Sequence, residues 1–525
     1  MLTTMFRLAA APTALALSAV LVPAATAGAD EAPSDSLRTV PVPDSVRGPK
    51  FPSFTPDGER LVFTGTPEGS TRSEIMTIRE DGTGLTCLTC GLDTGDSKDL
   101  SQPLVFPDGR RMLVNSGIPG EGTLVLECED KISKCRDPRA VPLNFPEPGE
   151  GNVLQKGREV RIAPDGKHIA FTQIRTTPTG EPGYLADVGT LRRTESGYEV
   201  DDARVVSAKG EAKSFTHDGQ GLVVSEYVDT PEAANPDDFL FDLETGRKTR
   251  LTYANDYDED FQFSPDGERY VVGSGRDSDI FATLSQVTRP NFIGPGLQPV
   301  FFTLFNQRRE RPDLLEPWLV RSASEEKGEL GEPLAPGATD SGWDSRMKNH
   351  WSPDSTKVAF WQQNMEDATE SRMVVADVSD RPSDPLPARA TPAPDWADPL
   401  KDYVPETFRP AESRPGQASG SVIVEEHPHP DNPELTVLKV TYDHFSDDGK
   451  SVIDGTEKAV YTAGGVVGTA HYTADLTMSG AHEGTLTADL YADPGAGDGH
   501  EPEPGQTKLE GTAVSEVDGH RLQLP

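Results

Sequence analysis

The chain of 525 residues is poor in several kinds of residue, and the first shortage is of positive charge. It has 49 Lys and Arg against 86 Asp and Glu, so its formal net charge is −37. Nucleic acids and anionic lipid surfaces are bound through clustered basic residues, so this balance argues against both partners. We interpret the acidity as a solubility feature of an exported protein or, alternatively, as an attraction for cations and basic ligands.

Long apolar runs are missing too, except near the N-terminus. There Arg7 precedes an apolar stretch from Leu8 to Val22, and Ala25-Thr-Ala27 has the small residues of a cleavage point. We therefore expect a signal peptide over residues 1–27 and an exported protein, either secreted or retained in the cell envelope. The stretch is too short and too rich in alanine for a membrane anchor, and we expect no transmembrane segment.

Cysteine is scarce, with four in the whole chain. Cys87 and Cys90 form a C-x-x-C, and Cys128 and Cys135 flank a short polar stretch. Four cysteines allow three pairings, and in an exported protein we expect the two local disulfides, Cys87–Cys90 and Cys128–Cys135. A zinc site of four thiolates and a redox-active C-x-x-C are the alternatives, although the spacing between the second two suits zinc poorly.

Motifs of catalysis are absent as well. The sequence has no G-x-S-x-G elbow, no phosphate-binding glycine loop and no dinucleotide fingerprint. Catalytic triads are assembled in space, and no local pattern points to one here. We therefore nominate no catalytic residue and consider an enzyme the less favoured class.

What the chain does have is one four-residue sequence motif in six copies. The aspartates of the copies are 51, 57, 53, 48 and 88 residues apart, a period typical of solenoids and propellers. Proline presets φ, aspartate bonds to its own turn and glycine accepts a positive φ, so each copy predicts a tight turn between two strands. The copies are Thr55-Pro-Asp-Gly58, Phe106-Pro-Asp-Gly109, Ala163-Pro-Asp-Gly166, Thr216-His-Asp-Gly219, Ser264-Pro-Asp-Gly267 and Ser352-Pro-Asp-Ser355.

Each period has room for four antiparallel strands, which is the size of one propeller blade. We therefore predict an all-β fold, with a six-bladed propeller over residues 50–390. Residues 28–49 form a lead whose alternating part, residues 37–42, is a candidate for the strand that closes the ring.

These repeats resemble the PD40, or WD40-like, repeats of TolB-like β-propellers over roughly two thirds of the chain. The resemblance implies the fold but no particular activity, because one fold carries many functions. Two departures are evident. The α/β domain that precedes the propeller in TolB is missing from this sequence, and so is the α/β-hydrolase domain that follows it in prolyl-oligopeptidase-type enzymes.

After the repeats, the sequence changes character twice. Residues 391–420 are rich in proline and predict an extended linker. From 421 to 525 apolar and polar residues alternate again, as in Tyr472, Ala474 and Leu476, which is typical of strands with one buried face. We predict a small antiparallel β domain there, sandwich-like or a curved sheet.

The 88-residue gap marks an insertion over residues 275–316, on the face of the irregular loops. Such a long loop is uncommon without a purpose, so it predicts either a ligand-binding wall or lid, or else a packed extra hairpin or oligomer contact. The candidate ligand-binding residues are Phe301, Phe302, Phe305, Arg308 and Arg309 in this insertion, with Trp343, Arg346 and His350 in the loop before the last copy.

Asp256, Asp258 and Asp260 alternate along one segment at the same mouth. Carboxylate oxygens are the ligands that Ca²⁺ prefers, so a calcium site is one interpretation and a solvated acidic loop the other. No further cofactor is indicated. His350 can be a base or a ligand, or a structural residue held by hydrogen bonds.

The favoured function is an exported binding module for a protein, a carbohydrate or a cationic ligand, at the loop face of the fifth and sixth blades. The first alternative is a metal-assisted polysaccharide lyase or hydrolase built on the propeller. The second is a structural protein of the cell envelope whose residues 421–525 are adhesive.

Overall fold

A computed structural model gives the fold of the chain. It describes residues 37–95, 99–117, 122–147, 153–178, 182–276, 278–307, 314–407, 409–462, 468–495 and 506–524. The expected signal peptide lies outside these residues. Among the described helices, none has the length and apolar character needed to cross a membrane.

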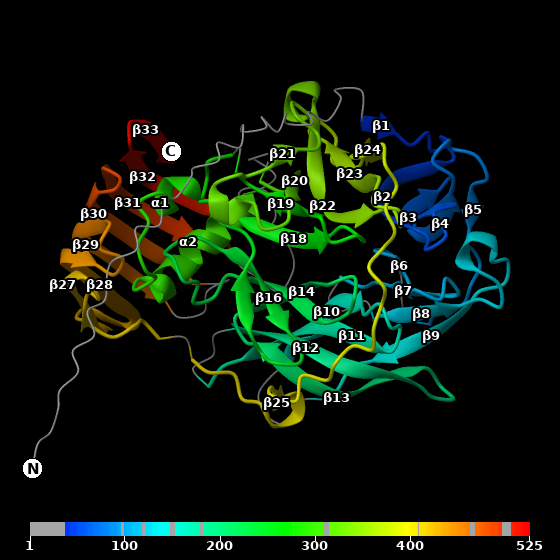
Figure 1. Cartoon of the computed structure of the whole chain (residues 1–525), viewed down its shortest axis with the longest axis horizontal. Helices are drawn as coiled ribbons and strands as arrows, with labels where there is room; N and C mark the ends of the chain where they lie inside the picture. The colour runs from blue at the N-terminus through cyan, green and yellow to red at the C-terminus, as the bar shows by residue number, and fades with distance from the viewer. Residues whose placement is uncertain are drawn as a thin grey trace, which may run out of the picture.

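The residues up to about 390 form antiparallel sheets that resemble propeller blades (Figure 1). Three of them contain four consecutive strands, paired in chain order. Their strands are β2 (Val46–Phe54), β3 (Leu61–Pro67), β4 (Glu74–Ile78) and β5 (Thr86–Cys87); β14 (Gly210–Phe215), β15 (Gly221–Glu226), β16 (Asp237–Asp242) and β17 (Lys248–Arg250); β18 (Asp258–Phe263), β19 (Arg269–Ser274), β20 (Glu316–Arg321) and β21 (Glu332–Pro333).

A fourth sheet brings the two ends of this part together. It has the order β1-β24-β23-β22, and Leu37 of β1 lies opposite Ala376 of β24. This is the segment for which the sequence predicts a ring-closing strand. The strands are β1 (Leu37–Thr39), β22 (Trp343–Trp351), β23 (Lys357–Asn364) and β24 (Ser371–Asp377).

The units around the second and third turns are fused, which the sequence did not predict. Strands β9 and β13 pair in parallel, with Tyr198 opposite Leu143, so that one sheet of nine strands results when β25 is included. Tyr198 and Val200 are buried, so the β12–β13 hairpin is held by apolar contact. The strands are β6 (Leu104–Val105), β7 (Arg111–Val114), β8 (Leu124–Glu127), β9 (Arg139–Asn144), β10 (Val153–Ile162), β11 (His168–Thr176), β12 (Pro182–Arg193), β13 (Tyr198–Ser207) and β25 (Asp398–Pro399).

All six repeated motifs are tight turns in the structure. The Gly58 N–H donates to the Thr55 carbonyl at 2.8 Å, and the strands on either side pair with each other. The last position has a positive φ in each turn, 68° at Gly58 and 61° even at Ser355, where the sequence has no glycine. This conformation is sterically unfavourable for serine, because serine has a Cβ atom and glycine has none.

The insertion before β20 contains helices α1 (Ala282–Ser285) and α2 (Gly294–Asn306). It is therefore not the extra hairpin that was one of the expectations. Pro295 fits the first turn of α2, where its missing N–H is not needed. Shorter 3₁₀ turns elsewhere are Ile132–Lys134, Glu325–Lys327, Thr339–Ser341 and Leu400–Asp402.

The C-terminal part is one antiparallel sheet of eight strands that follow one another in order, at the left of Figure 1. One face is buried, because Tyr472, Ala474 and Leu476 are buried while Asp475 between them is exposed. The strands are β26 (Arg414–Pro415), β27 (Ser419–His429), β28 (Asn432–Ser446), β29 (Ser451–Thr462), β30 (Ala470–Gly480), β31 (Gly484–Asp493), β32 (Lys508–Val517) and β33 (His520–Leu524).

The insertion covers the buried face of this sheet. Leu297, Val300 and Leu304 of α2 belong to the same apolar core as Leu476 and Leu490 of the sheet. The approach is close, since a Cβ at Gly296 would lie 2.2 Å from the Ala459 Cβ. The insertion thus attaches the C-terminal sheet to the blade-like sheets.

Candidate functional site

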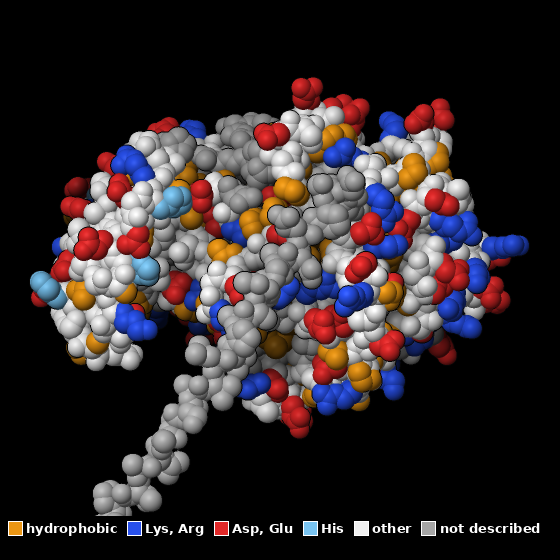
Figure 2. All heavy atoms as spheres, turned by 45° about the horizontal axis from the view of Figure 1, so that its top comes forward, with side chains coloured by type: hydrophobic (Ala, Val, Ile, Leu, Met, Phe, Trp, Pro, Cys, Tyr) orange, Lys and Arg blue, Asp and Glu red, His pale blue; other side chains and the backbone are white. Residues whose placement is uncertain are grey.

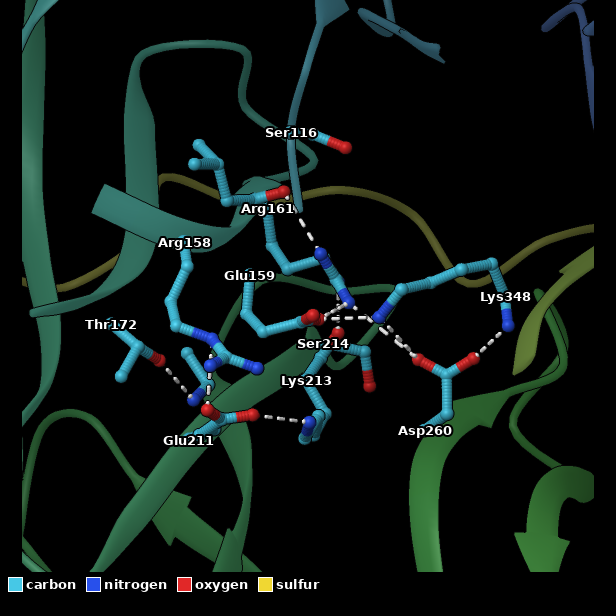
Figure 3. A network of polar contacts seen from close by, with 12 residues as sticks. Ser116, Arg158, Glu159, Arg161, Thr172, Glu211, Lys213, Ser214, Asp260 and Lys348 are labelled. Carbon is cyan, nitrogen blue, oxygen red and sulfur yellow. Dashed lines mark hydrogen bonds and ion pairs between the residues drawn. The ribbon is translucent and has the colours of Figure 1, made fainter. Parts of the chain in front are cut away.

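The first strands of successive sheets pack against one another, and four of them carry charged side chains into the centre. These strands are β10, β14, β18 and β22. Four cations and four anions meet there, so the set is neutral at pH 7, and we call it the charge network. Its members are Arg158, Arg161, Lys213 and Lys348 with Glu159, Glu211, Glu259 and Asp260. Figure 3 labels all of its members except Glu259.

One half of the charge network is centred on Lys213, whose side chain is fully buried. Its Nζ lies 2.9 Å from a carboxylate oxygen of Glu211 and also contacts Glu259. The Arg158 Nε lies 2.9 Å from the other oxygen of Glu211, and the Tyr257 hydroxyl donates to Glu259 at 2.6 Å. Every charge in this half therefore has an opposite charge or a donor beside it.

The other half is centred on Lys348 of β22. Its Nζ lies 2.6 Å from Glu159 and 3.3 Å from Asp260. The Arg161 guanidinium contacts Glu159 and lies 3.6 Å from Asp260 (Figure 3). The Lys348 backbone has φ 77°, and its N–H donates to Asp260 as well. A positive φ at a lysine is strained, and the bond to Asp260 compensates for it.

The pKa values follow from this pairing. Burial opposes ionisation of Glu159, but Lys348 and Lys213 outweigh burial and hold the pKa of Glu159 well below its usual range. Burial likewise opposes the charge of Lys213, yet Glu211 and Glu259 raise the pKa of Lys213. The groups are therefore ionised together, as expected where opposite charges compensate desolvation.

His350 lines a small cavity beside the charge network. Burial lowers the pKa of this imidazole to about 4, so it is neutral at pH 7. The cavity offers about 10 Å³ to the centre of a water molecule, which suits a single water. Its lining residues are Phe51, Gln102, Pro103, Leu104, Ser116, Arg161, Gln262, Lys348 and His350.

Chemically, this arrangement stabilises its own charges rather than a substrate. General acid–base catalysis needs a titrating group within reach of a bound substrate. Within the described residues the charge network satisfies its carboxylates with its own cations, and the cavity beside it has no room for a sugar or a peptide.

The aromatic residues proposed as ligand contacts are used inside the protein. Phe301 and Phe302 of α2 stack on Tyr227 and Tyr184, with ring centroids 6.0 and 6.5 Å apart. Phe305 lies 5.3 Å from the Tyr257 ring. These three phenylalanines therefore pack against tyrosines of the protein itself rather than form an aromatic wall for a ligand. Helix α2 lies between these tyrosines and the C-terminal sheet.

The other candidate ligand-binding residues do not form one site. The Arg346 guanidinium pairs with Asp344 at 2.7 Å, and Trp343 lies under Arg372, whose guanidinium carbon is 4.2 Å from the ring centroid. His350 lies on β22, as Trp343 and Arg346 do, and lines the cavity described above. Arg308 and Arg309 lie outside the described residues.

The proposed calcium ligands do not come together. Asp256 accepts backbone N–H groups of Phe281 and Ala282 at the start of α1, Asp258 pairs with Arg276 at 2.9 Å, and Asp260 belongs to the charge network. Burial raises the pKa of Asp256 to about 8, so this carboxyl is mostly protonated at pH 7. In the described part of the chain, the one cluster with metal-ligand spacing is elsewhere, at Asp443, His444 and Asp454 on the exposed surface.

The sequence contains a signal for the charge network. In four repeats, charged residues stand two to five positions before the first residue of the aspartate turn, in the strand that leads into it. Charged residues are rarely buried unless they are paired. Four such strands meeting at one centre predict a buried set of ion pairs, although not which residues pair.

The cysteines form the two local disulfides, Cys87–Cys90 and Cys128–Cys135, with Cα atoms 5.7 and 5.9 Å apart. The zinc alternative, which needs four free thiolates, is therefore wrong for this structure. Ser133, inside the second loop, donates to Asp57 of the first turn at 2.9 Å. That loop is thereby tied to the neighbouring sheet.

Comparison with known proteins gives distant structural likenesses only. No family model matches the chain, and no curated protein matches it either. Because no family model matches, the similarity to PD40 repeats is limited to the repeated sequence motif.

Three solved structures illustrate the likenesses. TolB from Acinetobacter baumannii is 13% identical, with 64% of each chain covered and a TM-score of 0.32. Oligogalacturonate lyase from Vibrio parahaemolyticus is 13% identical, with 66% of this chain and 95% of that chain covered and a TM-score of 0.35. The β-propeller domain of the Trilobed protease from Pyrococcus furiosus is 10% identical, with 79% and 95% covered and a TM-score of 0.32.

Proposed function

We propose that this protein is an exported binding module: a six-bladed propeller that carries a C-terminal sheet as its ligand-binding surface. The sheets around the six turns and the pairing of β1 with β24 support the blade count. The apolar stretch before Ala27 supports export. The paired charges of the network favour binding over catalysis, because they leave a cavity for one water only.

The observation that carries the proposal is the outer face of β30–β32. Four carboxylates lie there on alternate positions, against one lysine at the start of β32. Asp475 stands opposite Thr487, Asp489 opposite Thr512, and Glu510 opposite Tyr491. The exposed members of this face are His471, Asp475, Thr477, Thr485, Thr487, Asp489, Tyr491, Lys508, Glu510, Thr512 and Glu516.

The charge of this region selects the partner. Residues 421–525 contain 19 acidic and five basic residues. Figure 2 shows acidic side chains, pale-blue histidines and a few basic side chains over the C-terminal sheet at the left. A concentrated negative field attracts positively charged ligands and steers their approach. We commit to a basic protein or peptide segment as the ligand.

The test is the binding of a decalysine peptide to the full chain. In one variant Asp475→Asn, Asp489→Asn, Glu510→Gln and Glu516→Gln neutralise the face. A matched control removes the same charge from exposed positions elsewhere, with Glu68→Gln, Glu129→Gln, Glu244→Gln and Glu366→Gln. The face variant is expected to bind about tenfold more weakly, corresponding to about 1.4 kcal/mol, and the control to bind nearly as the wild type. Equal weakening in both variants would refute a site on this face.

A metal-assisted polysaccharide lyase or hydrolase remains the second candidate, for one reason. His350 is neutral at pH 7 and only partly buried, and a neutral imidazole can act as a base or bind a metal. Elemental mass spectrometry of the mature protein, together with an assay on oligogalacturonate with added Mn²⁺, tests it. Turnover that disappears in His350→Gln would replace the binding proposal with this one.

A further inference from the structure

The proline-rich segment after β24 does not hang free of the blade-like sheets but crosses their Pro-Asp-Gly turns, as the yellow trace in front of the molecule in Figure 1. We call residues 383–391 the strap. The Ser383 N–H donates to the Asp354 carbonyl at 3.1 Å, and its hydroxyl donates to Asp266. The Leu386 N–H then donates to the Pro265 carbonyl at 2.8 Å. The strap thus passes from the sixth turn to the fifth.

It continues in the same way to the fourth and third turns. Arg389 donates its N–H to the Asp218 carbonyl at 3.1 Å and its guanidinium to the Asp218 carboxylate at 3.0 Å. The Thr391 N–H donates to the Asp165 carboxylate at 3.1 Å. Four neighbouring turns therefore bind one extended segment of this chain.

The chemistry of these contacts repeats from turn to turn. An extended, proline-containing chain has no internal hydrogen bonds, so its N–H groups must find acceptors outside. In each turn one oxygen of the aspartate bonds to the turn itself, as the Asp218 Oδ1 does with the Gln220 N–H. In the turns under the strap, a turn carbonyl or the other carboxylate oxygen accepts from the passing chain. At the first two turns that second oxygen already accepts within the chain, from Ser133 at Asp57 and from Arg111 at Asp108. A Pro-Asp-Gly turn is thus a docking unit for extended peptide.

Two turns, 55–58 and 106–109, do not carry the strap, and among the described residues no other proline-rich segment crosses them. They are neighbours, since they share one pocket, with a volume of about 160 Å³. Drug-sized ligands occupy pockets of about 300–1,000 Å³, so this one suits a single side chain and its backbone. It is lined by Thr55, Pro56, Asp57, Pro107, Asp108, Gly109, Lys131 and Ser133.

We infer that the first and second turns bind an extended peptide of a partner protein, one that contains proline together with serine or arginine. This site is separate from the acidic face of the C-terminal sheet and does not depend on it. The partner would continue the arc that the strap begins, with its N–H groups on the turn carbonyls and one side chain in the pocket.

The walls of the pocket fit this ligand. Lys131 lies 3.6 Å from Asp57 but its side chain is 54% exposed, so an arginine or hydroxyl of the peptide can take its place. Ser133 fixes one Asp57 oxygen, and Arg111 lies 2.7 Å from the Asp108 carboxylate. Surface ion pairs of this kind contribute little stability, so exchanging them costs little.

The experiment uses the chain's own strap as the probe. A fluorescent peptide with the sequence of residues 379–395 is titrated into the full-length protein and followed by anisotropy. Saturable binding with a stoichiometry of one is expected. The variant Asp57→Asn/Asp108→Asn should bind about tenfold more weakly, because asparagine keeps the acceptor of the turn but loses the second carboxylate oxygen. No saturable binding up to about 1 mM peptide would overturn the proposal.

The matched control is Asp165→Asn/Asp218→Asn at turns that the strap already covers. Its affinity should equal that of the wild type. If this control alone loses affinity, the peptide displaces the strap and the proposal is wrong. A photoreactive group at the Leu386 position of the peptide, used with the wild-type protein, gives a second readout that does not depend on variants folding. Crosslinks should map to residues 55–57, 107–109 or 131–133, and crosslinks to 216–219 or 264–267 would overturn the site.

Discussion

Two of the regions that bury charge in this molecule do so in opposite ways. The charge network at the centre of the blade-like sheets joins eight ionised groups, so that each carboxylate has more than one partner. The core between the insertion and the C-terminal sheet is mostly apolar, and among the described residues it contains one ion pair, Arg289 and Glu457, whose side chains are fully buried. In the first region several opposite charges together stabilise each buried charge. In the second region a single opposite charge does so.

The single pair is completely satisfied. The Arg289 Nη2 lies 2.6 Å from Glu457, and the Tyr442 and Tyr472 hydroxyls donate to the two oxygens of that carboxylate at 2.7 and 2.9 Å. The remaining donor of Arg289 bonds to the Leu284 and Val287 carbonyls. Nothing nearby can replace either partner, so we expect this pair to be the more sensitive of the two regions.

The largest effect should come from Arg289→Met. It leaves Glu457 charged in an apolar core, which costs about 4 kcal/mol of the free energy of unfolding. Chemical unfolding measured by fluorescence checks this value. As a control, Arg192→Met removes a cation of an exposed pair and should cost less than about 1 kcal/mol. Adding Glu457→Leu to Arg289→Met should restore much of the loss, and an unrestored double variant would contradict the explanation.

A smaller effect is expected from Lys213→Met in the charge network. Glu211 keeps Arg158, and Glu259 keeps the Tyr257 hydroxyl, so the cost should be about 3 kcal/mol, at the low end for a broken buried pair. Combining it with Lys348→Met sharpens the comparison. The two losses should not add, because both cations act on the same set of carboxylates. Simple additivity in chemical unfolding would show that the network is a set of independent pairs.

The next effect concerns pH, through His350. Its pKa is about 4 in the folded protein against an ordinary value of 6.5. As the pH falls from 6.5 to 4, the unfolded chain gains a proton that the folded protein does not, so stability is lost over this range. We expect the wild type to lose about 2 kcal/mol more than His350→Gln between pH 7 and 4. Parallel curves of unfolding free energy against pH in the two proteins would contradict this.

The turns and strands could be predicted because their causes are local. Pro56, Asp57 and Gly58 act within one tight turn, and the structure has that turn with φ 68° at the glycine. The alternation of Tyr472 and its neighbours likewise reports one buried face directly. In both cases the information is contained in a few consecutive residues.

The charge network, the insertion and the core pair could not be predicted in the same way. Glu159 and Lys348 are 189 residues apart, and Arg289 and Glu457 are 168 apart, so no local pattern reveals either pairing. Helix α2 begins Gly294-Pro-Gly296, which is a poor start by helix propensity. It is helical because Leu297 and Val300 pack into a core formed by a sheet more than a hundred residues later.

The smallest effect should come from the strap, which lies outside both buried regions. The side chain of Arg389 is 63% exposed, so Arg389→Ala should change the free energy of unfolding by less than about 1 kcal/mol. Its effect should instead be local, because the Arg389 guanidinium is one of several independent contacts along the strap. Hydrogen exchange measured by mass spectrometry should show faster exchange at residues 383–391 and unchanged exchange in β14 and β15. Faster exchange in β14 and β15 as well would contradict this prediction. It would mean that the strap stabilises the sheets and does not only bind the surface of their turns.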